Sequence, residues 1–226
     1  DFADLLQDAG VRSLNISLDT LQPDRFMLLT RRDRFDRVKN NIDLMLEKGF
    51  VVKVNAVIMK GLNDDELIDF VAWTKDNPVH VRFIEFMPFS GNHWNSHRVF
   101  SMHEMVDKVR QVYQVNEMPN RPHDTARLFA VPGHAGTFAI IATMTAPFCA
   151  GCNRIRLTAD GKIKNCLFSK EETNLLAAFR RGQDLLPLIR ASIHSKAREL
   201  GGQFSANPDK VEADKIHNRS MITIGG

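Results

Sequence analysis

Cysteine, net charge and long apolar runs are all scarce in this sequence. Its 226 residues contain 3 cysteines and carry a formal net charge of +3. Three thiols cannot all pair as disulfides, and a disulfide framework is unusual at this length. The charge is too small to indicate nucleic-acid binding by itself, and no apolar run approaches the length of a membrane-spanning helix. We therefore expect no disulfide scaffold, no nucleic-acid partner and no membrane partner.

The printed sequence begins without an initiator methionine. Residues 1–6 read as the inside of an amphipathic helix and not as a signal or transit peptide. An apolar content of 43% with 25% charged residues is typical of a soluble globular protein. The length allows one large domain or two small ones. We interpret the chain as a piece of a longer protein, cut at its N-terminus.

The first part of the chain alternates between strand and helix patterns. Residues 14–19, 51–59 and 81–88 predict strands, and residues 35–48 and 64–75 predict helices. Asn63 is expected to cap the second of these helices. This alternation predicts an α/β fold in which parallel strands are joined by right-handed crossovers. Three such strands are too few to close a barrel.

The character of the sequence changes in the polar loop at residues 90–98, and we place a domain boundary there, between residues 92 and 93. Residues 101–113 predict a helix with a capping box formed by Ser101 and Glu104. Two strands are expected at 126–131 and 137–143. Residues 154–159 and 162–168 predict a hairpin, with Asp160-Gly161 as a two-residue type I′ turn.

The cysteines are the clearest functional signal, because they are clustered as C-x2-C-x13-C at Cys149, Cys152 and Cys166. Buried structural cysteines would not be expected to cluster in this way. Zinc normally takes four protein ligands, and the sequence offers only His123 or His134, at a distance, as the fourth. Three cysteines can instead hold an iron–sulfur cluster and leave one iron open to a substrate. The softness and number of the thiolates favour this interpretation.

Arg154 and Arg156 follow Cys152 directly and alternate along a predicted strand. They could be charges that protect an edge strand, or guanidinium groups that bind a phosphate or a purine edge. Their adjacency to the cysteines favours the second interpretation. The predicted two-residue turn, however, pairs Ile155 with Cys166 and so puts both arginines on the opposite face. A twist, a bulge or a longer loop would remove this conflict.

Polar residues also occur within and at the ends of the first strands. Lys53 lies between apolar residues of its strand, and burying a lysine without a partner is costly. Ser17 and Met87 lie at the carboxyl ends of their strands, where barrel enzymes place ligand-binding groups. Each of these residues, taken alone, is more often structural than functional.

Several stretches together resemble one family. They are residues 15–19, 53–55, 59–63, 82–88, 148–156, 166–168 and 224–226, and they run in the family order across nearly the whole chain. The chain is similar to the C-terminal two thirds of the GTP 3′,8-cyclases, the radical S-adenosylmethionine enzymes of molybdenum cofactor biosynthesis.

This resemblance implies a fold and a set of site residues. Residues 1–92 would be the C-terminal part of a partial (β/α) radical SAM barrel, and residues 93–226 a smaller α+β auxiliary-cluster domain. The implied auxiliary 4Fe–4S ligands are Cys149, Cys152 and Cys166, with an open iron that meets the guanine of GTP. The implied GTP contacts are Lys53, Arg154, Ile155 and Arg156. Ser17 and Met87 would contact S-adenosylmethionine, and the terminal Gly225-Gly226 would reach into the active site, so the implied catalytic residues are Arg154, Arg156, Gly225 and Gly226.

The implied reaction cyclises GTP to (8S)-3′,8-cyclo-7,8-dihydroguanosine 5′-triphosphate, the first step of molybdopterin synthesis. The family also needs a C-x3-C-x2-C motif for a second 4Fe–4S cluster that cleaves S-adenosylmethionine. This sequence lacks that motif, so we expect the chain to be inactive alone. The alternatives are the auxiliary-cluster domain of another radical SAM enzyme and a zinc-binding module. The expected partners are GTP, S-adenosylmethionine, the pterin-forming next enzyme of the pathway and a second copy of the chain, in the cytoplasm or the mitochondrial matrix.

Overall fold

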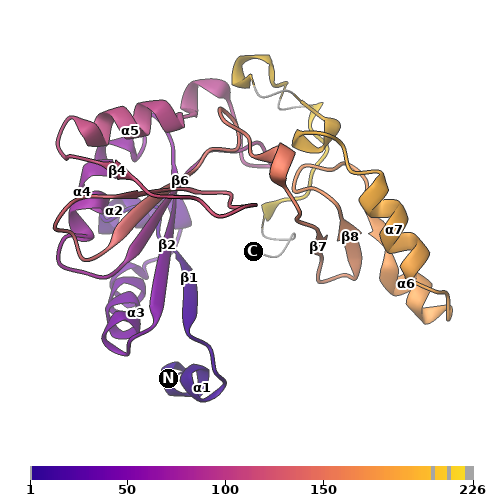
Figure 1. Ribbon diagram of the computed structural model, residues 1–226, viewed down its shortest axis with the longest axis horizontal. Coiled ribbons are helices and arrows are strands. Elements are labelled where there is room, and N and C mark those ends of the chain that lie inside the picture. Colours follow the sequence, from indigo (N-terminus) through magenta and orange to yellow (C-terminus); the bar gives the residue numbers. More distant parts are fainter. Residues whose placement is uncertain (1, 205–206, 213–214, 222–226) are drawn as a thin grey trace. The chain divides into compact units, whose positions relative to one another are not determined.

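The structure is a computed structural model that describes residues 2–204, 207–212 and 215–221 (Figure 1). Its contacts define two compact units, which are interleaved in the sequence. Unit 1 consists of residues 1–86 and 99–142, and unit 2 consists of residues 87–98 and 143–226. The predicted contiguous domains 1–92 and 93–226 stay a prediction.

Unit 1 is a mixed α/β unit built on one sheet. Its helices are α1 (Ala3–Asp8), α2 (Pro23–Thr30), α3 (Phe35–Glu47), the 3₁₀ turn η1 (Asp64–Glu66), α4 (Leu67–Trp73) and α5 (Met102–Arg110). Its strands are β1 (Ser13–Ser17), β2 (Val51–Ile58), β3 (His80–Glu85), β4 (Asn116–Glu117), β5 (Arg127–Ala130) and β6 (Thr137–Ile141).

The strand order of this sheet is β1-β2-β3-β6-β5-β4. The pairs β1–β2, β2–β3 and β3–β6 are parallel, and β6–β5 and β5–β4 are antiparallel. The predicted α/β alternation and the parallel pairing of the first three strands are confirmed. The strands expected near 126–131 and 137–143 also form, and they extend the same sheet.

One face of the sheet forms the core of unit 1. Along β2, Val52, Val54, Ala56 and Ile58 are fully buried and alternate with half-exposed residues. Aromatic rings fill the space on the buried side, where the rings of Phe70 and Phe83 meet edge to face and those of Phe129 and Phe138 are stacked. Because side chains alternate along a strand, the other face of β2 carries its two polar residues, Lys53 and Asn55, together with Val51 and Val57.

Asn63 does not cap the helix that follows it, contrary to the sequence prediction. The chain enters η1 with no side-chain cap from Asn63. Its amide Nδ2 instead donates to the carbonyl oxygens of Asp19 at 2.7 Å and Val57 at 2.8 Å, and its Oδ1 accepts from the Met59 amide at 2.8 Å. Asn63 is fully buried, and these backbone groups match both of its amide N–H donors and one acceptor site of its Oδ1.

Glu66 makes a second buried connection within unit 1. Its carboxylate accepts hydrogen bonds from the Thr20 hydroxyl and the Leu21 amide, both at 2.6 Å, and forms an ion pair with Arg25. The Glu66 side chain is 1% exposed. This carboxylate therefore fixes the β1–α2 connection against the start of α4.

The capping box expected for the helix after the polar loop is confirmed. Ser101 Oγ accepts from the Glu104 amide at 3.3 Å, and Glu104 Oε2 accepts from the Ser101 amide at 2.9 Å. The helix itself, α5, is shorter at its C-terminal end than the predicted 101–113. In the part of the chain that the structure describes, no helix has the length and apolar character needed to cross a membrane.

Unit 2 contains short elements around a small sheet of order β7-β8-β9. Its strands are β7 (Arg156–Leu157), β8 (Lys162–Lys164) and β9 (Thr173–Asn174). Its helices are α6 (Leu175–Arg180) and α7 (Leu186–His194), with the 3₁₀ turns η2 (Ser96–Arg98), η3 (Cys149–Gly151), η4 (Leu200–Gly202) and η5 (Pro208–Lys210).

The predicted hairpin forms, but its predicted two-residue turn is wrong. Arg156 pairs with Lys164 and Leu157 with Ile163, and the Thr158 amide donates to the Lys162 carbonyl at 2.8 Å. The loop therefore has three residues, 159–161, and Gly161 takes the left-handed position with φ of 73°. This is the three-residue hairpin in which a glycine ends the turn. The one-residue change shifts the register of the whole hairpin.

Candidate functional site

Lys53 belongs to a polar face of the unit 1 sheet. In the parallel register it stands between Asn15 of β1 and His80 of β3, and Asn55 stands beside Arg82. Paired residues of neighbouring strands share a face. The face opposite the apolar core thus carries two cationic side chains, Lys53 and Arg82, among amides and an imidazole.

The electrostatics of this face favour an anionic ligand. Burial, followed by the positive charges of Arg82 and Lys53, lowers the pKa of His80 to about 4, so the imidazole is neutral at pH 7. Burial also lowers the pKa of Arg82. Among the described residues, Arg82 Nε and Asn55 Oδ1 are buried and have no hydrogen-bond partner. Buried polar atoms without a partner are rare in proteins, and a bound ligand would supply what they lack.

Ser17 lies at the end of β1 and lines an open pocket of about 950 Å³ within unit 1. Asp19 and three arginines, Arg32, Arg34 and Arg37, also line it. Burial raises the pKa of Asp19, although the Val57 amide partly offsets this by donating to its carboxylate at 2.8 Å. Met87, the other residue expected to contact S-adenosylmethionine, is half-buried and belongs to unit 2, where its carbonyl accepts from Asn92 at 2.8 Å.

The three cysteines all lie in unit 2 as free, partly exposed thiols. Cys149 begins η3, Cys152 directly follows it, and Cys166 follows β8. Within residues 2–204, 207–212 and 215–221, no set of three or more histidine, cysteine or acidic side chains is arranged to hold a metal ion. The support for a metal centre here is the chemistry of the donors, since three soft thiols in one unit suit iron–sulfur ligation.

Hydrogen-bond donors contact two of these thiols, Cys149 and Cys152. The Leu200 amide donates to Cys149 Sγ at 3.5 Å, and Lys196 Nζ donates to Cys152 Sγ at 3.3 Å. Burial raises the pKa of the Cys149 thiol, and the nearby Cys166 and Cys152 raise it further. Burial acts in the same direction at Cys152, but the Arg154 amide and the Lys196 ammonium outweigh it and lower the pKa of that thiol. Donors of this kind are typical of the surroundings of thiolate ligands.

The corrected hairpin register removes the conflict over the arginines. Arg156 lies opposite Lys164, so Arg154 and Arg156 have the same strand parity as Cys166 rather than the opposite one. Arg154 and Ile155 are exposed, with Ile155 at 46%, and Arg156 is half-exposed. Of the twist, the bulge and the longer loop that could remove the conflict, the structure has the longer loop.

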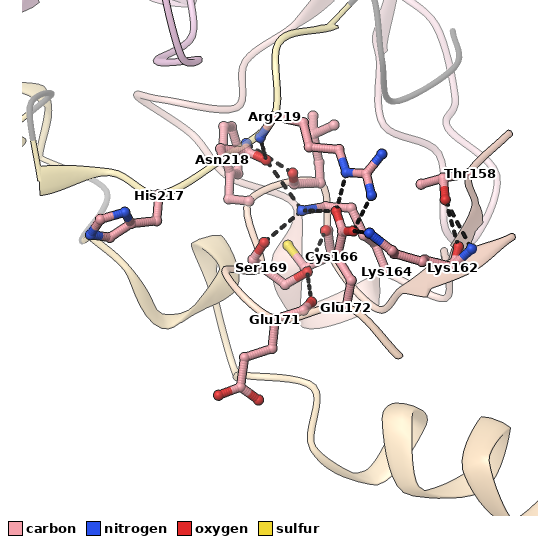
Figure 2. Close-up of polar contacts among 12 residues, drawn as sticks. Thr158, Lys162, Lys164, Cys166, Ser169, Glu171, Glu172, His217, Asn218 and Arg219 are labelled. Atoms are coloured by element: carbon pink, nitrogen blue, oxygen red, sulfur yellow. Dashed lines mark hydrogen bonds and ion pairs between the residues drawn. The ribbon is translucent and has the colours of Figure 1, made fainter. Parts of the chain in front are cut away.

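A charged cluster lies on β8 and the segment that follows β8, and it holds part of the C-terminal segment (Figure 2). The Lys164 side chain is only 1% exposed. Its Nζ donates to the Ser169 carbonyl at 2.6 Å and to Asn218 Oδ1 at 3.2 Å. The same Nζ forms an ion pair with Glu172 Oε1 at 3.5 Å. Arg219 forms ion pairs with Glu172 and with Asp160 of the hairpin loop. These contacts fix residues 218–219 against the hairpin that precedes Cys166.

Glu172 is the carboxylate that Lys162, Lys164 and Arg219 share. Its contribution to the free energy of unfolding should therefore depend on pH. Burial tends to raise the pKa of Glu172, but Arg219, Lys164 and Lys162 outweigh it and hold the pKa below its ordinary value of 4.5. A carboxylate with a lowered pKa stabilises the fold above its unfolded pKa and loses this effect as the pH falls through its folded pKa. We expect Glu172→Gln to lower the free energy of unfolding by about 1–3 kcal/mol at pH 7, and by progressively less below pH 4.5.

Urea unfolding of both proteins between pH 3 and pH 8 measures this difference. The matched control is Glu171→Gln, since Glu171 is exposed and its side chain points away from the cluster in Figure 2. The control is expected to match the unchanged chain throughout. A loss for Glu172→Gln that persists undiminished at pH 3 would contradict the ion-pair explanation.

Sequence reasoning missed Arg82 as part of the cationic face and Lys196 beside the thiols. Arg82 lies in one of the stretches that carry the family resemblance, and its parity with Lys53 could have been found by aligning the two strands. Lys196 follows α7 and is far from the cysteines in sequence, and it has no signal in any motif. The predicted Gly225 and Gly226 lie outside the described residues.

Comparisons with known proteins agree with both parts of the chain. Residues 1–74 match the sequence model of the radical SAM superfamily, in keeping with a parallel-rich α/β sheet. Residues 79–201, which include all three cysteines, match the model named Molybdenum Cofactor Synthesis C. The two matches together define a class of protein: a radical SAM protein with an additional C-terminal region.

Similar proteins occur in plants, animals and bacteria. The chain is 46% identical to "GTP 3′,8-cyclase, mitochondrial" of Arabidopsis thaliana, over 98% of the chain and 56% of that protein. It is 44% identical to "Molybdenum cofactor biosynthesis protein 1" of Homo sapiens, over 97% of the chain and 34% of that protein. It is 36% identical to "GTP 3′,8-cyclase" of Listeria monocytogenes, over 99% of the chain and 68% of that protein. The chain therefore belongs to the family of the GTP 3′,8-cyclases, and it spans little more than half of the length of the Arabidopsis relative and about a third of the length of the human one.

Proposed function

We propose that this chain carries the GTP-binding and auxiliary-cluster parts of an enzyme that cyclises GTP. The product is (8S)-3′,8-cyclo-7,8-dihydroguanosine 5′-triphosphate, formed by joining C3′ of the ribose to C8 of the guanine in the first step of molybdenum cofactor biosynthesis. Two relatives named GTP 3′,8-cyclase support this proposal. The parallel strands of unit 1 would be the C-terminal part of a partial (β/α) barrel.

The observation that carries the proposal is the cationic face around Lys53. A triphosphate accepts hydrogen bonds, so it can satisfy both the Lys53 ammonium and the buried Arg82 Nε. A hydroxyl or amino group of the nucleoside can donate to Asn55 Oδ1, the other buried atom that lacks a partner. The neutral His80 adds no charge and can exchange hydrogen bonds with Thr137, its neighbour on β6.

The thiols of unit 2 supply the second part of the function. A 4Fe–4S cluster held by Cys149, Cys152 and Cys166 would present one iron that is open to the guanine. Arg154, Ile155 and Arg156 are proposed as further GTP contacts, with the two guanidinium groups balancing charge on the nucleotide. Ser17 and Met87 are proposed as S-adenosylmethionine contacts, and the pocket that Ser17 lines supports this role for Ser17. Gly225 and Gly226 remain proposed as active-site residues.

Several finer expectations stay predictions. They are the inactivity of the chain by itself, the homodimer, the pterin-forming partner enzyme, and a location in the cytoplasm or the mitochondrial matrix. The Arabidopsis relative is named as mitochondrial.

The test is to reconstitute the chain anaerobically with iron and sulfide and to titrate GTP while recording the cluster's electron paramagnetic resonance spectrum. GTP is expected to perturb the spectrum and ATP is not. Lys53→Met is expected to weaken GTP binding by about 10- to 100-fold, because it removes a charge-assisted hydrogen bond of about 1.5–3 kcal/mol. Lys75→Met, at an exposed lysine of the same unit, serves as the control.

Three results would contradict the proposal. A chain that takes up zinc alone would indicate the binding-module alternative. A cluster whose spectrum ignores GTP would indicate another radical SAM enzyme. Equal GTP affinities for Lys53→Met and Lys75→Met would remove the cationic face from the binding site.

A further inference from the structure

The end of α7 and the segment that follows it contact the chain around all three cysteines of unit 2. Lys196 donates to Cys152 Sγ, and the Leu200 amide donates to Cys149 Sγ. On the side of the third thiol, Asn165 Nδ2 donates to the Ser192 carbonyl at 2.8 Å and to Ser195 Oγ at 3.3 Å. Residues 192–200 thus join the C-x2-C turn to Asn165, the residue before Cys166, through one short stretch of chain.

Lys196 makes the densest of these contacts. Its ammonium donates to the Cys152 carbonyl at 3.0 Å, to Cys152 Sγ at 3.3 Å and to the Arg154 carbonyl at 3.0 Å. A lysine has three N–H donors, and each is matched here by an acceptor in residues 152–154. A lysine at the surface usually directs its N–H donors to water, whereas Lys196 directs all three to one turn.

The position of the ammonium has two consequences. It fixes the backbone on both sides of Asn153. The side chains of Cys152 and Arg154 therefore extend from the same fixed turn. It also puts a positive charge beside a sulfur that would be a cluster ligand. Hydrogen bonds and positive charge at the ligand sulfurs favour the reduced form of an iron–sulfur cluster, because reduction adds negative charge to it.

We propose that Lys196 is a positioning residue of the thiol centre, which holds the Cys152–Arg154 turn and raises the reduction potential of the cluster bound there. This inference rests on the proposed function for its cluster, whereas the holding of the turn is a property of the chain itself. Lys196 acts through Cys152 and the backbone of Arg154, and it needs no contact with a substrate.

The test compares Lys196→Met and Lys196→Gln, which both remove the charge, with Lys196→Arg, which keeps it, and with Lys210→Met at an exposed lysine of unit 2. Redox titration of the reconstituted chains gives the midpoint potential. Hydrogen exchange of the metal-free chains gives the protection of residues 149–156. Far-UV circular dichroism selects the variants that fold.

The uncharged variants are expected to favour the oxidised cluster about tenfold more than the unchanged chain does, a shift of about −59 mV for one electron. They should also exchange faster in residues 149–156. Lys196→Arg should keep most of the potential, and Lys210→Met all of it. A purely structural role for Lys196 would alter exchange and leave the potential unchanged, which would overturn the electrostatic part.

Failure of the two proposals can be told apart. If the unchanged chain assembles no cluster, the proposed function fails, and the exchange measurement still decides whether Lys196 holds the turn. If the cluster assembles and both uncharged variants match the unchanged chain in potential and exchange, the inference about Lys196 is wrong while the proposed function stands.

Discussion

Replacing Cys166 with alanine is expected to abolish cluster assembly, so that iron falls from about four atoms to less than one per reconstituted chain. Cys166 is the only donor of the proposed centre that lies after the hairpin, and the sequence contains no fourth cysteine that could replace it. Two thiolates would leave two irons of a cubane without a protein ligand. Iron and sulfide analysis with the visible absorption spectrum measures the loss.

The control for this prediction is the stability of the metal-free chain. Cys166 is only partly buried, so alanine removes little packing, and the metal-free variant is expected to unfold within about 1 kcal/mol of the unchanged chain. Cys149→Ala and Cys152→Ala should lose iron to the same degree, since the centre needs all three thiols. Full iron content in any one of these variants would exclude that cysteine as a ligand.

Replacing Glu66 with alanine is expected to destabilise the chain by about 3–5 kcal/mol, the usual cost of removing one partner of a buried ion pair. Glu66 is 1% exposed and Arg25 is 20% exposed. The substitution leaves the Arg25 guanidinium, the Thr20 hydroxyl and the Leu21 amide without their common acceptor. Because a domain is stable by only about 5–15 kcal/mol, guanidinium unfolding should show an unmistakable shift of the midpoint.

Asp65 provides a matched control, because it pairs with the same arginine but is 60% exposed. Asp65→Ala is expected to cost less than about 1 kcal/mol, as exposed ion pairs usually do. Equal losses for the two variants would mean that burial of Glu66 adds nothing to its interactions. The contrast therefore tests the burial and the hydrogen bonds of the carboxylate, rather than its charge alone.

Much of the fold could be predicted because it depends on local patterns. The period-two alternation of Val52, Val54 and Ala56 with polar residues predicts a strand wherever it occurs, and strands separated by helices pair in parallel. The capping box of Ser101 and Glu104 needs only four consecutive residues. The thiol motif likewise was evident from spacing alone, since clustering of rare residues requires no knowledge of the fold.

Details of the hairpin and of Asn63 could not be predicted for a common reason. Asp160-Gly161 suits a two-residue turn, but the same glycine also suits the last position of a three-residue loop, and only pairing along β7 and β8 distinguishes them. Asn63 has the preferred residue type for a helix cap, but its side chain instead bonds the nearby Val57 carbonyl and Met59 amide and the remote Asp19 carbonyl. In both cases the residue type suits two local structures, and only the contacts made in the folded chain decide between them.

The sequence by itself determined the α/β class, the thiol motif, and the family to which these residues pointed. Only the tertiary structure decided that Arg154 and Arg156 have the strand parity of Cys166 and that Lys196 binds the turn at Cys152. The physical reason is the range of the interactions. Backbone propensity and side-chain periodicity act between near neighbours, whereas sheet register, buried charge and the satisfaction of polar groups depend on residues that meet only after the chain has folded.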